Sequence, residues 1–155
     1  MTIDDWFEAM DGAQADLEGF SDPTGVGLLD RKDSERTTAE LSFHPAVSIL
    51  DCVVLSDPGT SNHWMLVRHP VAAGMVALLS HDGDSRIGHP DLDSFMAFAC
   101  ETSERDGHIE LDASDVELRV PDRRVMEELL ASIADADDRD QVEFVLHPRG
   151  MERIG

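Results

Sequence analysis

The residues best suited to chemistry lie in the stretch LLSHDGDSRIGHP, residues 78–90, where His81, Asp82 and Asp84 stand close together. Imidazole and carboxylate groups bind zinc and iron, so one interpretation of this cluster is a His-Asp metal centre. Such centres take their ligands from helices of distant segments, whereas the flanks here are typical of strands. Asp82 and Gly83 also form a dipeptide that favours a two-residue hairpin turn. We therefore favour the turn and predict neither a metal nor a cofactor.

Histidine also occurs outside this stretch, and four of the seven histidines precede proline: His44, His69, His89 and His147. A residue before proline is pushed toward extended backbone, so we expect these pairs at strand ends and at entries to loops. A shared zinc site would require several of them to converge, and nothing in their spacing requires that.

No sequence motif indicates covalent catalysis or nucleotide chemistry. The chain has no G-x-S-x-G elbow, no P-loop and no GxGxxG. Cys52 and Cys100 lie in the apolar runs SILDCVVL and FMAFACE without a CxxC spacing, which predicts two buried thiols. We therefore predict no catalytic residues and a protein that is not an enzyme.

Charge limits the partners that the chain can bind. Its 155 residues carry 33 acids and 12 bases, spread along the chain, for a formal charge of −21. Nucleic acids and anionic membranes are unfavourable partners, because binding to either depends on clustered Lys and Arg. Two explanations stay open: a basic protein that the negative field steers into contact, or solubility in water, including a saline cytoplasm. The first twenty residues contain no base and no apolar run could span a bilayer, so we expect a cytoplasmic protein.

The elements that must position these residues fit one domain, residues 1–155. Helical spacing predicts an N-terminal helix within residues 1–20, with Thr2 as its N-cap. The apolar positions of this helix are Ile3, Trp6, Phe7 and Met10. Residues 21–37 are rich in Gly, Asp and Ser, which predicts a loop with a short strand at 26–29.

In residues 38–100 the apolar residues follow the patterns of β-strands. Ala39, Leu41 and Phe43 alternate with polar neighbours, and apolar runs follow at 48–55, 63–67 and 74–80. Turn residues separate these runs, so we predict successive antiparallel strands. A short helix then follows, with Asp91 as its N-cap and an apolar stripe of Leu92, Phe95, Met96 and Ala99.

The third part of the domain, residues 106–147, is predicted to hold a hairpin, a helix and a last strand. Strict alternation in 108–112 and 115–120 predicts the hairpin. We predict the last strand in the run VEFVLH, residues 142–147. The helix opens at Pro121, buries Val125, Met126, Leu129, Leu130 and Ile133, and is closed by Asp135, Asp137 and Asp138. The fold class is therefore α+β, with a mostly antiparallel sheet of about six strands and about three helices packed on it.

Five residues are candidates for contact with a partner: Trp64, Asp82, Asp84, Asp91 and Asp93. Trp64 lies in HWMLV, where we favour a core position over an exposed interface anchor. The four acids lie on the predicted turn and helix start. They form either a negative patch for a basic partner or a solvated rim in which Asp91 or Asp93 caps the helix.

Residues 57–99 resemble the central part of the SUKH superfamily. The corresponding pieces, in order, are DPGTSN, HWMLV, GMVALL, SHDGD and DLDSFMAF. The resemblance implies an α+β fold with a mostly antiparallel sheet, no catalytic centre and use as a binding module. Many bacterial SUKH proteins are immunity proteins that neutralise toxins, often nucleases, by binding them.

The sequence thus predicts a non-enzymatic, acidic immunity protein that binds a basic partner such as a toxin domain, with the four acids imitating phosphates. Two alternatives stay open. One is a small metal-dependent hydrolase that uses His81 and Asp82. The other is a regulatory or assembly domain of a salt-adapted cell, whose acids serve hydration alone.

Overall fold

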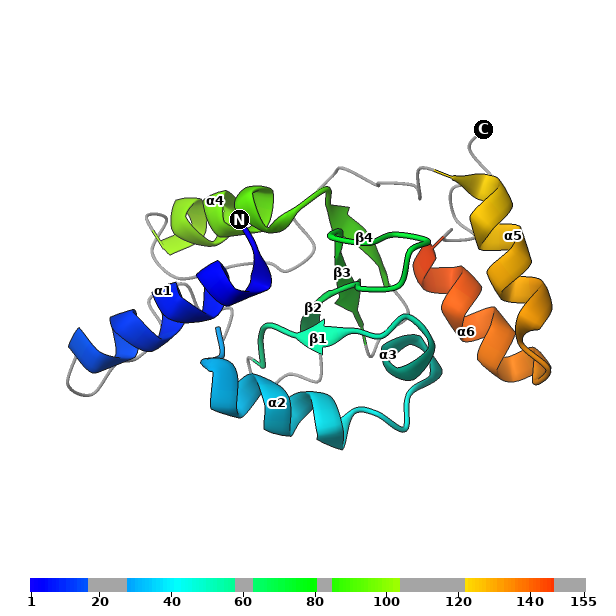
Figure 1. Cartoon of the computed structure of the whole chain (residues 1–155), viewed down its shortest axis with the longest axis horizontal. Coiled ribbons are helices and arrows are strands. Elements are labelled where there is room, and N and C mark those ends of the chain that lie inside the picture. Colours follow the sequence, from blue (N-terminus) through cyan, green and yellow to red (C-terminus); the bar gives the residue numbers. More distant parts are fainter. Residues whose placement is uncertain (17–27, 58–62, 81–84, 104–121, 147–155) are drawn as a thin grey trace.

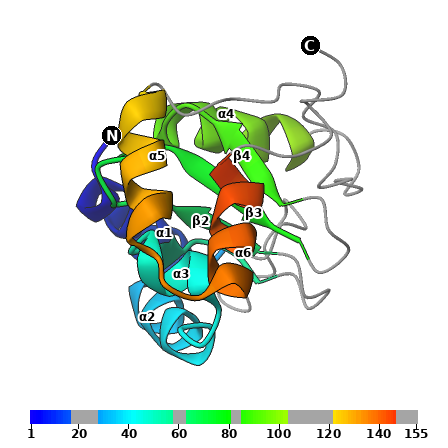
Figure 2. The same cartoon turned by 90° about the vertical axis from the view of Figure 1, so that its right-hand side faces the viewer.

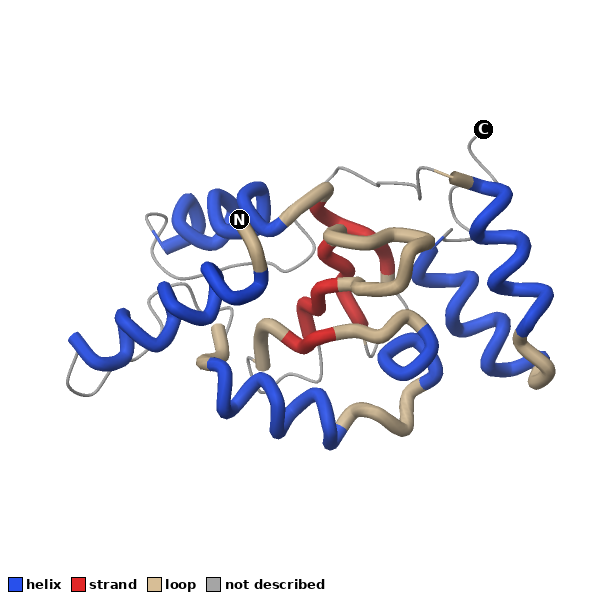
Figure 3. The backbone as a smooth tube through the Cα atoms, in the orientation of Figure 1, coloured by secondary structure: helices blue, strands red, loops and turns tan. Residues whose placement is uncertain are grey.

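A computed structural model describes residues 1–16, 28–57, 63–80, 85–103 and 122–146. Within these ranges a four-stranded β-sheet lies between helices (Figures 1 and 3). The helices are α1 (Ile3–Asp16), α2 (Arg31–Glu40), α3 (Pro45–Ile49), α4 (Leu92–Ser103), α5 (Arg123–Ser132) and α6 (Ala136–Leu146). The strands are β1 (Val53–Val54), β2 (His63–Leu66), β3 (Val76–Leu79) and β4 (Arg86–His89). The predicted α+β class is confirmed, although the described residues hold four strands where about six were predicted, and six helices where about three were.

The sheet is an antiparallel meander in the order β1-β2-β3-β4. Strand β2 pairs with β3 along its whole length, from His63 opposite Leu79 to Leu66 opposite Val76. All residues of both strands are buried, which explains why their sequences show no polar face. The predicted antiparallel strands at 63–67 and 74–80 are therefore confirmed.

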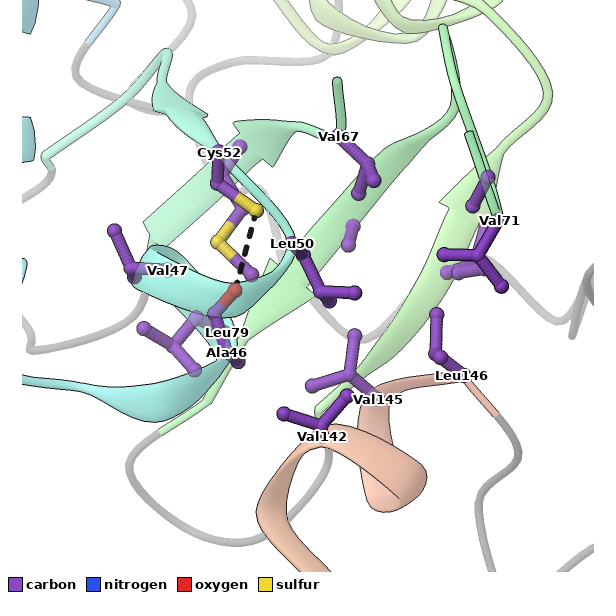
Figure 4. Packing of buried hydrophobic residues seen from close by; sticks show 14 of the residues in the cluster. Ala46, Val47, Leu50, Cys52, Val67, Val71, Leu79, Val142, Val145 and Leu146 are labelled. Carbon is purple, nitrogen blue, oxygen red and sulfur yellow. Dashed lines mark hydrogen bonds between the residues drawn. The ribbon is translucent and has the colours of Figure 1, made fainter. Parts of the chain in front are cut away.

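Each face of the sheet has its own hydrophobic core. On one face, Trp64 and Leu78 pack with Trp6 of α1 and Phe95 of α4. On the other face, Met65 and Ala77 belong to a larger cluster that includes residues of α3, α5 and α6. Figure 4 shows Val142, Val145 and Leu146 of this larger cluster beside Leu50. The result is three layers, with α1 and α4 on one side of the sheet and α5 and α6 on the other (Figures 1 and 2).

The predicted N-terminal helix is confirmed as α1, as far as the chain is described there. Thr2 Oγ1 accepts a hydrogen bond from the Asp5 amide at 3.1 Å, and Asp5 Oδ2 accepts one from the Thr2 amide at 3.0 Å. This reciprocal pair is a capping box in which aspartate takes the acidic position, and it satisfies backbone donors at the first turn. Trp6 and Phe7 are buried, as their spacing predicts.

The predictions for residues 21–43 were wrong in two respects. Helix α2 begins after Asp30, whose carboxylate accepts the Asp33 amide at 2.8 Å, and it extends through Ala39 into the region predicted as a strand. Its buried residues are Ser34 and Thr37, so the face that packs inward is polar and gives no apolar period. Of the short strand predicted at 26–29, residues 26 and 27 lie outside the described residues, and Leu28 forms an isolated bridge with Ser56.

The apolar run 48–55, predicted as one strand, is divided between a helix and a strand. Helix α3 begins at Pro45, because proline at the first helical position lacks only an amide hydrogen that would be unpaired there. The strand β1 is limited to Val53–Val54. Both halves of the run are buried, so their apolar composition does not distinguish helix from strand.

The prediction of a last strand at 142–147 was also wrong, because residues 136–146 form α6. Val142, Val145 and Leu146 are buried at the i, i+3, i+4 spacing of a helix. The acids predicted to close the preceding helix instead begin this one, since Asp135 Oδ1 accepts the amides of Asp137 and Asp138 at 2.8 and 3.0 Å.

Two other helix predictions are confirmed. Asp91 is the N-cap of α4, because its Oδ1 accepts a hydrogen bond from the Ser94 amide at 2.8 Å. Asp122 is the N-cap of α5, whose stripe buries Met126 and Leu130. The predicted hairpin at 108–112 and 115–120 lies outside the described residues.

Helix α2 covers the outer edge of β1 with hydroxyl groups. Ser34 Oγ donates to the Val54 carbonyl at 2.5 Å, and Thr38 Oγ1 accepts the Val54 amide at 2.9 Å. An edge strand with free backbone groups can pair with another chain, and these two side chains occupy both groups of Val54. The polar inward face of α2 is therefore required by the strand that it covers.

We predict that Ser34→Ala lowers the free energy of unfolding by about 1–3 kcal/mol, because the buried Val54 carbonyl loses its partner. Urea denaturation followed by circular dichroism measures the change. Ser132→Ala is the matched control, since the Ser132 hydroxyl donates to Leu129 O on an exposed helix end, and we expect a change within about 0.5 kcal/mol. Equal effects of the two substitutions would contradict the role given to Ser34.

Candidate functional site

The five candidate binding residues do not form one described surface. Trp64 is fully buried in β2, as the favoured core interpretation predicts. His81, Asp82 and Asp84 lie outside the described residues. The strands on either side of them pair antiparallel, with Leu78 opposite Arg86, which is the pairing that a hairpin requires.

Asp91 and Asp93 both lie at the start of α4, but they differ in their partners. The hydrogen bond from the Ser94 amide to Asp91 lowers the pKa of the Asp91 carboxyl, so that Asp91 has a structural role as a cap. Asp93 is 65% exposed, and its Oδ2 lies 3.1 Å from the N-terminal ammonium of Met1. This contact raises the pKa of that ammonium and joins the start of α1 to the start of α4.

Most of the described arginines form ion pairs with carboxylates on the protein surface. The pairs are Arg31–Asp4, Arg36–Asp33, Arg68–Asp51, Arg123–Glu127 and Arg124–Glu128, with nitrogen–oxygen distances of 2.7–3.3 Å. Pairs as exposed as these contribute little to stability. Their consequence is electrostatic, because the charge of each of these five arginines is held beside a carboxylate. The excess of acids over the whole chain then determines the sign of the field outside the protein.

Three described histidines use Nδ1 for a bond to the backbone. In two His-Pro pairs, the histidine Nδ1 accepts a hydrogen bond from the amide of the residue that follows the proline. The Ala46 amide donates to His44 at 3.1 Å, and the Val71 amide donates to His69 at 3.0 Å. His63 Nδ1 lies 3.0 Å from the Ser56 carbonyl, to which it donates. His44 is extended before Pro45 and caps α3, as expected of a residue before proline. These rings are held by local structure.

No group of three or more His, Cys, Asp and Glu side chains within the described ranges is placed to hold a metal ion. His81 and Asp82, on which the metal interpretation was centred, lie outside those ranges.

His89, at the end of β4, is the titratable group in the most unusual surroundings, and sequence reasoning did not single it out. Its ring lies 5.1 Å from Trp64, 5.5 Å from Phe95 and 5.1 Å from Phe98, measured between ring centroids. The side chain is only 7% exposed, and Nε2 has no hydrogen-bond partner. Burial lowers the pKa of His89 from 6.5 to about 4, against a smaller opposing effect of the Asp91 carboxylate. The ring is therefore neutral near pH 7.

Cys52 is the thiol that the structure describes, and the prediction that it is buried is confirmed. Its Sγ lies 3.6 Å from the Ala46 carbonyl. Figure 4 marks this contact with a dashed line. Burial raises the pKa of the thiol to about 12, so almost no thiolate forms at neutral pH. Cys52 is therefore unsuited to nucleophilic catalysis. The side chain of Cys100 lies outside the described residues.

Comparisons with family models, with curated proteins and with solved structures give no match to this chain. Among the described helices, none is both long and apolar enough to cross a lipid bilayer.

We predict that protonation of His89 makes the protein less stable in acid. The pKa is lower in the folded state than in the unfolded chain, so the stabilisation is complete above about pH 6.5 and is lost as the pH falls toward 4. The loss between pH 7 and pH 4 is on the order of 3 kcal/mol, from the difference between the two pKa values.

The measurement is urea denaturation of the wild type, of His89→Phe and of His89→Leu at several pH values. Both variants lack the titrating ring, so they should not lose this part of the stability in acid. Between pH 7 and pH 4 the free energy of unfolding of the wild type should therefore fall by about 3 kcal/mol more than that of either variant. The absolute stability of each variant does not enter this comparison. A difference in unfolding free energy between wild type and variant that stays constant from pH 7 to pH 4 would contradict the prediction.

We also predict that iodoacetamide at pH 8 leaves Cys52 unmodified in the native protein, because the thiol is buried and protonated. In 6 M guanidinium chloride the same residue should be fully alkylated. Peptide mass spectrometry measures the modification at Cys52 separately from that at Cys100. Rapid labelling of Cys52 in the native protein would contradict its buried position.

Proposed function

We propose that this chain is an acidic binding protein whose partner is a basic protein. The observation that carries the proposal is the charge of −21 together with the local pairing of arginines to carboxylates. A protein surface of one dominant sign accelerates encounter with a partner of the opposite sign and repels wrong partners. A cationic protein is thus the class of macromolecule that this chain is best suited to bind.

The more specific proposal is an immunity protein that neutralises a toxin domain, as the resemblance of residues 57–99 to the SUKH superfamily implies. A toxin that acts on nucleic acid must present basic surface to phosphates, and an acidic protein can occupy that surface in their place. The α+β class and the antiparallel pairing of β2 with β3 and of β3 with β4 are compatible with this family. Inhibition by binding requires no bond-making chemistry.

In this proposal the described cysteine and histidine side chains have structural roles. The Cys52 thiol is protonated, and the His89 ring is enclosed by aromatic side chains. His44, His63 and His69 each use one ring nitrogen for a backbone bond. A general base needs a free nitrogen near a substrate-accessible surface, which His89 does not offer.

Co-expression tests the proposal. The probe is the C-terminal domain of a toxin encoded beside the gene for this chain, produced in a host whose growth it arrests. We expect this chain to restore growth and to form a stable complex whose dissociation constant rises with salt between about 50 and 500 mM, because steering and charge pairs are screened. No rescue, together with no binding at the lowest salt, would reject the proposed function.

Salt dependence of stability separates this function from adaptation to a saline cell. If the acids serve hydration alone, molar potassium chloride should raise the melting temperature strongly, and no basic partner should bind. A binding protein should instead fold well in dilute buffer. Thermal unfolding followed by circular dichroism at increasing potassium chloride concentration makes this comparison.

A further inference from the structure

The short segment that joins α2 to α3, residues 41–44, presents an apolar ring to solvent. Phe43 is 80% exposed, whereas the other large apolar side chains of the described residues are buried or half-buried, apart from Met1 at 47%. The segment runs along the outside of the molecule (Figure 1). An isolated exposed apolar residue needs no explanation by itself, so the surroundings of Phe43 must decide its meaning.

Hydrogen bonds fix the backbone on both sides of Phe43. The Leu41 amide donates to Thr37 O at 3.0 Å, and the His44 amide donates to Leu41 O at 2.9 Å. Ser42 Oγ donates to the Ala39 carbonyl at 2.7 Å. The ring is thus attached to a turn that is already ordered.

The following helix holds the same turn from the other side. Ser48 Oγ donates to the Ser42 carbonyl, and the Ala46 amide donates to His44 Nδ1 at 3.1 Å. Helix α2 is itself fixed to β1 through Ser34 and Thr38. Phe43 therefore projects from a segment attached to the sheet at one end and to the larger core at the other.

An aromatic ring that is exposed on a rigid turn has the properties of an interface anchor. Aromatic side chains lose little conformational entropy on binding, and a fixed backbone removes the cost of ordering a loop. Anchors of this kind dominate the affinity of many protein interfaces. Glu40, three residues earlier in the chain, is also exposed and adds a negative charge near the end of α2.

Charge decides which partner the ring fits. A second copy of this chain would bring two surfaces of the same sign together, each belonging to a molecule with a formal charge of −21. A basic protein meets no such repulsion. We propose that Phe43 inserts into an apolar pocket, rimmed by Lys or Arg, on a basic protein partner; this inference rests on the proposed function and specifies its contact.

The test uses the complete chain and the purified toxin domain of the co-expression experiment, with dissociation constants measured by calorimetry at several salt concentrations. Phe43→Ala should raise the dissociation constant at least about tenfold at every salt concentration and leave the salt slope unchanged, because a phenyl ring carries no counterions. Phe43→Leu should retain most of the affinity.

Ala97→Ser is the matched control, since Ala97 is an exposed, neutral position on α4, on the opposite side of the sheet. Its dissociation constant should equal that of the wild type. Melting temperatures should agree among all four proteins, because neither position is buried.

The outcomes separate the two proposals. Wild-type affinity in Phe43→Ala would overturn the role of Phe43 and leave the proposed function intact. Absence of binding by the wild type would reject the proposed function, and the inference with it. Analytical ultracentrifugation supplies a further check: a homodimer that disappears in Phe43→Ala would show that a second copy occupies this ring, contrary to the inference.

Discussion

Burial of both faces of the sheet is the constraint on which the rest of the structure depends. Strands β2 and β3 place apolar side chains on each face, so neither face can meet water. One face is covered by α1 and α4, and the other by α3, α5 and α6. Helices must therefore come from both ends of the chain, before and after the sheet. This requirement also explains why residues as distant as Trp6 and Phe95 stack on one another, with their centroids 5.4 Å apart.

A sheet enclosed in this way leaves polar side chains few places except the edges, the helix starts and the surface. The described polar residues are used accordingly. Ser34 and Thr38 occupy the backbone groups of Val54, and Asp30, Asp91, Asp122 and Asp135 cap helices. His89 is used differently, because its ring lies within an aromatic cluster and its Nε2 has no hydrogen-bond partner. The free energy of keeping this ring neutral links the aromatic core to the pH of the solution.

Sequence periodicity predicted the parts of the fold in which a segment has one apolar face or one apolar run bounded by turn residues. Strands β2 and β3 and helices α1, α4 and α5 are of this kind. It failed for α2, whose buried residues are a serine and a threonine, because periodicity detects only apolar faces. It failed for 48–55 because a fully buried segment is apolar whether it is a helix or a strand.

The sequence of α6 does carry the signals of a helix. The i, i+3, i+4 spacing of Val142, Val145 and Leu146 and the cap at Asp135 both indicate a helix. The short apolar run VEFVL does not by itself distinguish a strand from a buried helix. Of the candidate site, the burial of Trp64 and the cap at Asp91 followed from local pattern. The surroundings of His89 and the exposure of Phe43 depend on contacts between distant segments, which no local pattern records.

Charge and shape have separate roles in a protein of this kind. A charge of −21 acts over about a Debye length, so it accelerates encounter with any cationic surface but distinguishes poorly among them. The same charge also destabilises the compact state by self-repulsion, which the two hydrophobic cores must offset. Discrimination among basic proteins then requires short-range complementarity, such as an apolar side chain in a matching pocket. In the proposed function, the field brings cationic proteins into contact, and the fixed ring of Phe43 selects the one whose surface has a pocket for it.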